Sequence, residues 1–139
     1  MATNMNRVVG RYLAIALSLL WGVVATAMGT DVVAQSYPSK PITLVVPFPP
    51  GAATDVFARA AGRRMGELMG AQVVILNRDG ASGVIGTDMV AKSAADGYVL
   101  LWGSSGPLAI SPVWMENLPY DPLRDFAPVS LFAKIPSLL

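Results

Sequence analysis

The alternation of apolar runs with helix-period segments predicts an α/β chain built on parallel strands. Largely apolar runs lie at residues 42–46, 72–76 and 98–102, and each is followed by a loop of small residues that opens a helical pattern. The first run has too few polar residues for a one-sided sheet, which predicts burial on both faces. The order strand, helix, strand, helix, strand predicts right-handed crossovers between parallel strands.

The segment from Thr54 to Gly70 has apolar residues at helical spacing. The residues predicted to face the sheet are Val56, Phe57, Ala60, Ala61, Met65 and Leu68. The predicted solvated face carries Arg59, Arg63, Arg64 and Glu67. Arg63 and Glu67 lie one turn apart, where they can pair. Gly62 and Gly66 favour close packing against the sheet, and Gly70 is expected to end the helix.

Weaker patterns follow the first helix. They predict a helix from about Val84 to Ser93, a short helix from Ala109 to Met115 and a fourth strand from Val129 to Ala133. Trp102 and Trp114 are expected to be core or packing residues. Trp102 also adjoins the third loop, where it is placed to shape a pocket.

Residues 1–34 have the three-part pattern of a secretory signal peptide. Two arginines and no acidic residue precede an uncharged apolar run from Tyr12 to Met28, and Val32-Val33-Ala34 offers small residues before a cleavage site. A cut after Ala27 is an alternative, and so is a retained anchor, because seventeen apolar residues lie near the lower limit for a membrane span. We predict cleavage and export to the periplasm, with residues 35–139 forming one α/β ligand-binding lobe.

Composition narrows the possible chemistry. The 139 residues include no Cys and no His, and the formal net charge is +1. Disulfides, thiolate metal sites and a cysteine nucleophile are excluded, and the usual general base is missing. A near-neutral chain without a basic cluster gives no electrostatic footprint for nucleic acid. We therefore expect no catalytic residue, cofactor, metal or nucleic-acid partner.

Three loops at the carboxyl ends of the predicted strands form the candidate site, because open parallel sheets bind ligands there. Thr54 or Asp55 is predicted to cap the first helix, whose free N–H groups and positive dipole end favour an anion. An ordinary strand–helix connection is the plainer interpretation of the first loop alone; three such loops favour a carboxylate site. The candidate ligand-binding residues are Gly51, Ala52, Ala53, Thr54, Asp55, Gly80, Ala81, Ser82, Gly83, Ser104 and Ser105.

Sharper motifs are absent from these loops. The glycines at 80, 83 and 86 do not have the dinucleotide-binding spacing, and no Gly-Lys-Ser/Thr occurs. Residues 103–106, Gly-Ser-Ser-Gly, do not match G-x-S-x-G, and a Ser-His-Asp triad needs a His. The spacing of Asp55, Asp79 and Asp88 matches no calcium loop.

Several stretches together resemble the substrate-binding proteins of tripartite tricarboxylate transporters, the Bug (Bordetella uptake gene) family. They are Tyr-Pro-Ser-Lys-Pro-Ile at 37–42, Val-Val-Pro-Phe-Pro-Pro-Gly at 45–51, Thr-Asp at 54–55, Asn-Arg at 77–78, Gly-Ala-Ser-Gly at 80–83, Asp-Gly-Tyr at 96–98 and Leu-Pro-Tyr-Asp-Pro-Leu-Arg-Asp-Phe-Ala-Pro-Val-Ser at 118–130. The resemblance implies a type II periplasmic binding protein with two lobes, which holds a small carboxylate between them and delivers it to a membrane permease. The ligand classes that it implies are di- or tricarboxylates, amino-acid-like acids and aromatic acids. It further implies that the first two loops bind the carboxylate, that the complete protein is a monomer, and that this chain corresponds to the N-terminal portion, with the second lobe missing.

The chain departs from the family pattern at three loop positions. Ala52 replaces a common Gly, Asp79 replaces a common Pro, and Val84 replaces a common Asn. Asp79 adds negative charge beside the expected carboxylate unless Arg78 offsets it. Two other interpretations stay open: a non-functional truncated gene product, and an enzyme that uses the same anion-binding loops.

Overall fold

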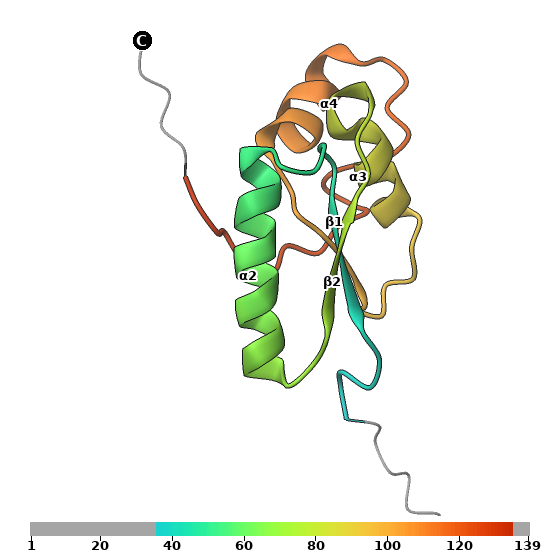
Figure 1. Cartoon of the computed structure of the whole chain (residues 1–139). Helices are drawn as coiled ribbons and strands as arrows, with labels where there is room; N and C mark the ends of the chain where they lie inside the picture. The colour runs from blue at the N-terminus through green and yellow to red at the C-terminus, as the bar shows by residue number, and fades with distance from the viewer. Residues whose placement is uncertain (1–35, 135–139) are drawn as a thin grey trace, which may run out of the picture. The chain divides into compact units, whose positions relative to one another are not determined.

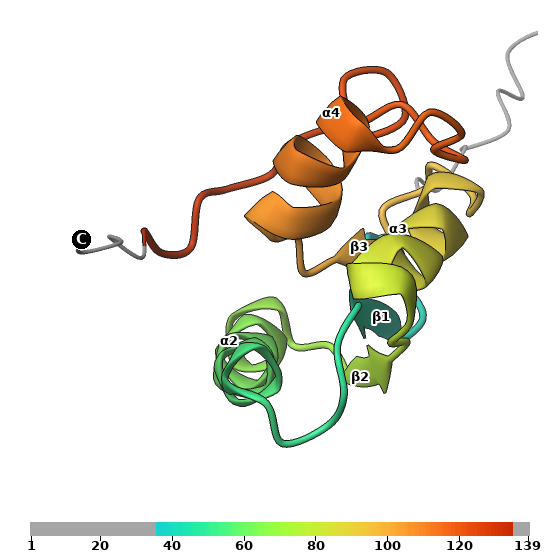
Figure 2. The same cartoon turned by 90° about the horizontal axis from the view of Figure 1, so that it is seen from above.

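The structure is a computed structural model that describes residues 36–134. The predicted signal peptide lies outside the described residues. Figure 1 shows the fold, in which three parallel strands form a sheet. The strands are β1 (Ile42–Val46), β2 (Val73–Asn77) and β3 (Val99–Leu101), in the order β2-β1-β3 (Figure 2). Leu44 on the central strand is in register with Ile75 on one side and Leu100 on the other. The predicted α/β fold with parallel strands is confirmed.

Helices cover both faces of this sheet. Figure 2 shows α2 (Ala53–Met69) on one side of the strands and α3 (Val84–Ala91) on the other. A one-turn helix, η1 (Ala81–Gly83), precedes α3, while a π-helical segment, η2 (Gly106–Ile110), and α4 (Ser111–Trp114) follow β3. The chain therefore steps from β1 outward to β2 and returns past β1 to β3, so the direction of winding reverses at the central strand.

The central strand is the core of the fold. Ile42, Val45 and Val46 have no exposed side-chain surface, which confirms the predicted burial of this strand on both faces. On the α2 side, Leu44, Val46 and Ala58 form a buried cluster. Phe48, Val73, Ile75, Leu100 and Trp102 pack against it.

The face of α2 that packs on the sheet differs from the prediction. Its buried residues are Asp55, Ala58 and Gly62, whereas Val56, Phe57 and Leu68 are 58%, 52% and 69% exposed. A Cβ at Gly62 would lie only 3.0 Å from Ile75 Cδ1, so the helix runs too close to the sheet for bulky side chains. The predicted apolar face is wrong, and the predicted close packing at Gly62 is confirmed.

Of two further predictions about α2, one is confirmed and one is wrong. Gly70 ends the helix as predicted, with a φ of 61° and its N–H donating to Gly66 O. The predicted Arg63–Glu67 pair is wrong, because Arg64 Nη1 instead lies 3.1 Å from Glu67 Oε2.

The region after β3 departs further from expectation. The predicted helix at Ala109 begins three residues earlier, and Trp114 is 66% exposed rather than packed in the interior. The predicted fourth strand at Val129–Ala133 is wrong: residues 129–134 are irregular. Within residues 36–134, no helix is both long and apolar enough to cross a membrane.

Candidate functional site

Gly83 of the second loop lies against the segments that follow β1 and β3. A Cβ added there would lie 3.3 Å from Pro107 Cγ, 3.4 Å from Pro47 O and 3.5 Å from Phe48 Cζ. These atoms belong to the segments that follow β3 and β1, so one glycine of the second loop touches both of them. These segments lie at the carboxyl end of the sheet, where the winding reverses between β1 and β3. Ligands bind at such switch points in open α/β sheets.

The second loop has a strained backbone that leaves N–H groups free. Residues 80–83 all have positive φ, including 47° at Ala81 and 55° at Ser82, where a side chain makes this conformation costly. Fully buried Thr87 donates its hydroxyl to Gly83 O at 2.8 Å and ties the loop to α3. The N–H groups of Ala81 and Ser82 have no hydrogen-bond partner among residues 36–134.

The first loop is organised by Asp55, but Asp55 does not cap the helix as predicted. The N-cap of α2 is Ala52, without a side-chain cap, so the capping role predicted for Thr54 or Asp55 is wrong. Asp55 is 3% exposed, and its Oδ2 accepts hydrogen bonds from Gly51 N–H at 2.8 Å and Arg59 Nε at 2.9 Å. The N–H groups of Ala53 and Thr54, at the start of the helix, have no partner in the described part of the chain.

Asn77, which the sequence analysis did not select, joins the first loop to β2. Its Nδ2 donates to Asp55 Oδ1 at 2.9 Å and to Phe48 O at 3.1 Å, and its Oδ1 accepts from Arg59 Nη2 at 3.1 Å. Two signals pointed to it: its place as the polar last residue of an apolar strand, and the Asn-Arg stretch at 77–78 that matches the family pattern.

These contacts determine the charge and role of Asp55. The hydrogen bond from Arg59, followed by those from Gly51 and Asn77, lowers the pKa of the Asp55 carboxyl from 3.8 to about 2. The group is an ionised carboxylate whose oxygens are already occupied, and it would repel a second carboxylate. The structure thus gives Asp55 a role in positioning the first loop.

The third loop contributes a free hydroxyl and a buried support. Ser104 Oγ is buried and has no hydrogen-bond partner within residues 36–134. Ser105 is exposed at the start of η2. Behind them, Tyr120 donates its hydroxyl to Pro107 O at 2.8 Å, and burial raises the pKa of this tyrosine. The second and third loops lie against each other, since a Cβ added at Gly106 would lie 3.8 Å from Ser82 O. Gly51 and Asp55 are instead held together with Asn77 at the end of β2.

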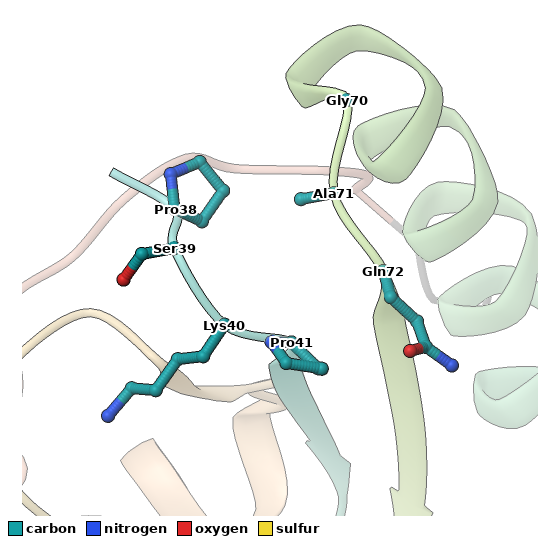
Figure 3. A pocket seen from close by; sticks show the side chains of 7 residues that line it. All are labelled: Pro38, Ser39, Lys40, Pro41, Gly70, Ala71 and Gln72. Carbon is teal, nitrogen blue, oxygen red and sulfur yellow. The ribbon is translucent and has the colours of Figure 1, made fainter. Parts of the chain in front are cut away.

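A separate hollow lies at the amino ends of the strands. It has a volume of about 220 Å³ and is lined by Pro38, Ser39, Lys40, Pro41, Gly70, Ala71 and Gln72 (Figure 3). None of these residues is among those predicted from the sequence to bind a ligand. Among the described residues, no group of three acidic, His or Cys side chains could hold a metal ion.

Comparison with known proteins places the chain among transporter receptors. The profile of the tripartite tricarboxylate transporter family receptor matches residues 57–139. The chain is 48% identical to protein BugT of Bordetella pertussis over 125 residues, which are 88% of this chain and 38% of BugT. It is 49% identical over 105 residues to a protein from the tcbD-tcbE intergenic region of Pseudomonas sp. strain P51, covering 76% of this chain and 31% of that protein.

Solved structures agree with the fold. The chain superposes with a TM-score of 0.64 and 35% identity on MatC from Rhodopseudomonas palustris with bound malate, over 67% of this chain and 32% of MatC. It superposes with a TM-score of 0.60 and 41% identity on R. palustris Rpa4515 with adipate, over 63% of this chain and 29% of that chain. It thus spans about a third of the relatives that it matches.

These matches support a binding protein over an enzyme, since the family is described as a transporter receptor. They confirm the resemblance inferred from the sequence. The chain belongs to the tripartite tricarboxylate transporter receptor family and is of the Bug type.

Proposed function

We propose that this chain forms one wall of a periplasmic solute-binding receptor, and that the wall binds the carboxylate group of a small organic acid. The observation that carries the proposal is the contact at Gly83 between the second loop and the segments that follow β1 and β3. The N–H groups of Ala53 and Thr54 on the first loop, and of Ala81 and Ser82 on the second, have no partner in the described part of the chain. Backbone N–H groups at helix starts favour anions, because they donate hydrogen bonds and lie at the positive dipole end.

The relatives support the chemical class of the ligand. MatC is described with bound malate and Rpa4515 with adipate, and both ligands are carboxylates. The free hydroxyl of Ser104 would add a donor from the third loop. Export by cleavage of residues 1–34 and delivery of the ligand to a membrane permease complete the proposed function.

A single wall predicts weak binding. The chain covers 38% of BugT, and a clamshell receptor encloses its ligand between two lobes. We therefore expect carboxylates to bind residues 35–139, the part left after the proposed cleavage, in the millimolar range. Calorimetry of the chain exported by a bacterial host, with malate, adipate and citrate as probes, tests this expectation. A sub-micromolar affinity would contradict the proposal that this chain supplies only one wall of the site.

Two matched glycine substitutions test where the acid binds. At Gly83, with a φ of 93°, Ala would place a Cβ 3.3 Å from Pro107 and separate the loops, so binding should be lost. At Gly70, with a φ of 61°, nothing lies within 4 Å of an added Cβ, so Gly70→Ala introduces backbone strain without touching the site. Equal affinity in Gly83→Ala and the unaltered chain would refute the proposed site, provided that circular dichroism shows both folded.

A further inference from the structure

Three aromatic side chains form a cluster beside the candidate loops. The ring of Phe132 lies 4.8 Å from the ring of Trp102 and 6.3 Å from that of Phe57, and both pairs are tilted. Such distances and tilts are typical of attractive aromatic pairs. The cluster brings together the end of β3, the start of α2 and the irregular segment at residues 129–134.

Each ring is linked to the loops that carry the free donors. Phe57 lies three residues after Thr54, on the same side of α2, and helical side chains lean over the preceding turn. That turn holds the unpartnered N–H groups of Ala53 and Thr54. Trp102 directly precedes the third loop, and its backbone N–H donates to Val45 O at 2.8 Å.

The cluster is anchored on one side and open on the other. Trp102 is half-buried against the core of Leu44, Val46 and Ala58. By contrast, Phe57 and Phe132 are 52% and 57% exposed. Apolar ring surface thus remains accessible near the N–H groups that are free to bind an anion, which is the composition of a small-molecule site.

We propose that Phe57, Trp102 and Phe132 determine the ligand class by holding an apolar body whose carboxylate head is bound by the loops. This inference rests on the proposed function. The matching ligand is an acid with an aromatic ring or an extended apolar chain. A compact polycarboxylate such as citrate would place polar groups against the rings and gain little from them.

Fluorescence of Trp102 provides a direct test. In residues 35–139, the part left after the proposed cleavage, the substitution Trp114→Phe leaves Trp102 as the one tryptophan. Titration of this variant with acetate, hexanoate and benzoate varies the apolar body while the single carboxylate is kept. We expect hexanoate and benzoate to change Trp102 emission and to bind roughly tenfold more tightly than acetate.

Substitutions in the cluster should reverse this preference. In the same background, Phe57→Ala and Phe132→Ala should each weaken benzoate binding by roughly threefold to tenfold. Phe132→Leu, which keeps apolar surface but removes the ring, should have a smaller effect. Leu68→Ala is the matched control, since Leu68 is an exposed apolar residue of α2 outside the cluster, and it should leave benzoate binding unchanged.

The outcomes separate the inference from the proposed function. Equal affinity for acetate and benzoate, still abolished by Gly83→Ala, would overturn the role of the cluster and leave the carboxylate site standing. Benzoate binding that depends on Phe57 but survives Gly83→Ala would overturn both, because the head group would not be held by the loops.

Discussion

The two ends of the sheet use their polar groups in opposite ways. At the carboxyl end, four backbone N–H groups on two loops and the Ser104 hydroxyl have no partner among residues 36–134. At the amino end, side chains satisfy one another: Tyr37 donates to Gly97 O at 2.7 Å, Tyr98 Oη accepts from Ser39 N–H at 2.8 Å, and Lys40 pairs with Asp96 at 3.1 Å.

The difference shows that a hollow does not by itself indicate a binding site. The hollow of about 220 Å³ lies at the amino end, where Lys40 is already engaged by Asp96 and by the ring of Tyr98 at 4.2 Å. The candidate site lies where donors remain free and where the backbone is strained at Ala81 and Ser82. Unsatisfied donors, rather than concavity, identify the end that binds an anion.

The largest loss of stability is expected from a side chain added at Gly86, where α3 packs against Pro47. A Cβ at Gly86 would overlap Arg78 O and lie 2.9 Å from Pro47 Cβ, so Gly86→Ala should push α3 away from the first loop. We expect a loss of about 3 kcal/mol in the free energy of unfolding, measured by urea denaturation. At the amino end, Gly70→Ala meets no atom within 4 Å and should cost about 1 kcal/mol of backbone strain. Equal losses of unfolding free energy in Gly86→Ala and Gly70→Ala would show that the carboxyl end is not tightly packed.

A smaller effect, dependent on pH, is expected from Asp55. Its folded pKa of about 2 lies below the ordinary 3.8, so the unfolded chain binds more protons as the pH falls. The stability that Asp55 contributes is therefore present above pH 3.8 and is lost as the pH falls through about 2. Asp55→Asn should unfold at lower urea concentration at pH 7 and should depend less on pH between 4 and 2.

Asp96→Asn is the matched control for Asp55→Asn. Its carboxyl pKa is also lowered, chiefly by the N–H of Tyr98, but Asp96 lies at the exposed amino end. We expect Asp96→Asn to cause the smaller loss at pH 7 and to leave carboxylate binding intact. If the two variants lose equal stability, Asp55 has no special part in organising the first loop.

The parts of the fold that could be predicted are those set by local pattern. The strand β1 was predicted from a run with one polar residue, Thr43, because a buried strand requires a largely apolar sequence. The end of α2 was predicted from Gly70, because the positive φ at a helix end favours glycine. The packed face of α2 could not be predicted from hydrophobicity. It is set by the distance between helix and sheet, which admits Ala58 and Gly62 and excludes Phe57.

Long-range contacts explain what the site prediction lacked. The small loops and their position were evident in the sequence, but Asp55 was expected at a helix cap. Its partner Asn77 is 22 residues away, and a contact over that separation cannot be predicted from local sequence pattern. The predicted strand at residues 129–133 had the right composition but has no partner strand in the described part of the chain, and a strand needs one to satisfy its backbone.

The smallest effect is expected from the amino-end ion pair. Lys40 and Asp96 have side chains that are 57% and 42% exposed, and ion pairs of this kind contribute little to stability. Lys40→Met should shift the urea midpoint slightly and leave malate affinity unchanged. A loss of malate binding in this variant would move the site to the hollow at the amino end.

The most direct test of the carboxyl-end site is a titration of the ¹⁵N-labelled chain with adipate, followed by NMR amide by amide. The amides of Ala53, Thr54, Ala81 and Ser82 are predicted to shift with a common saturation curve, while those of Lys40, Ala71 and Gln72 stay fixed. Adipamide, which has the same chain length but no charge, should shift neither group. Adipate-dependent shifts confined to residues 38–41 and 70–72 would contradict the assignment of carboxylate binding to the loops around Gly83.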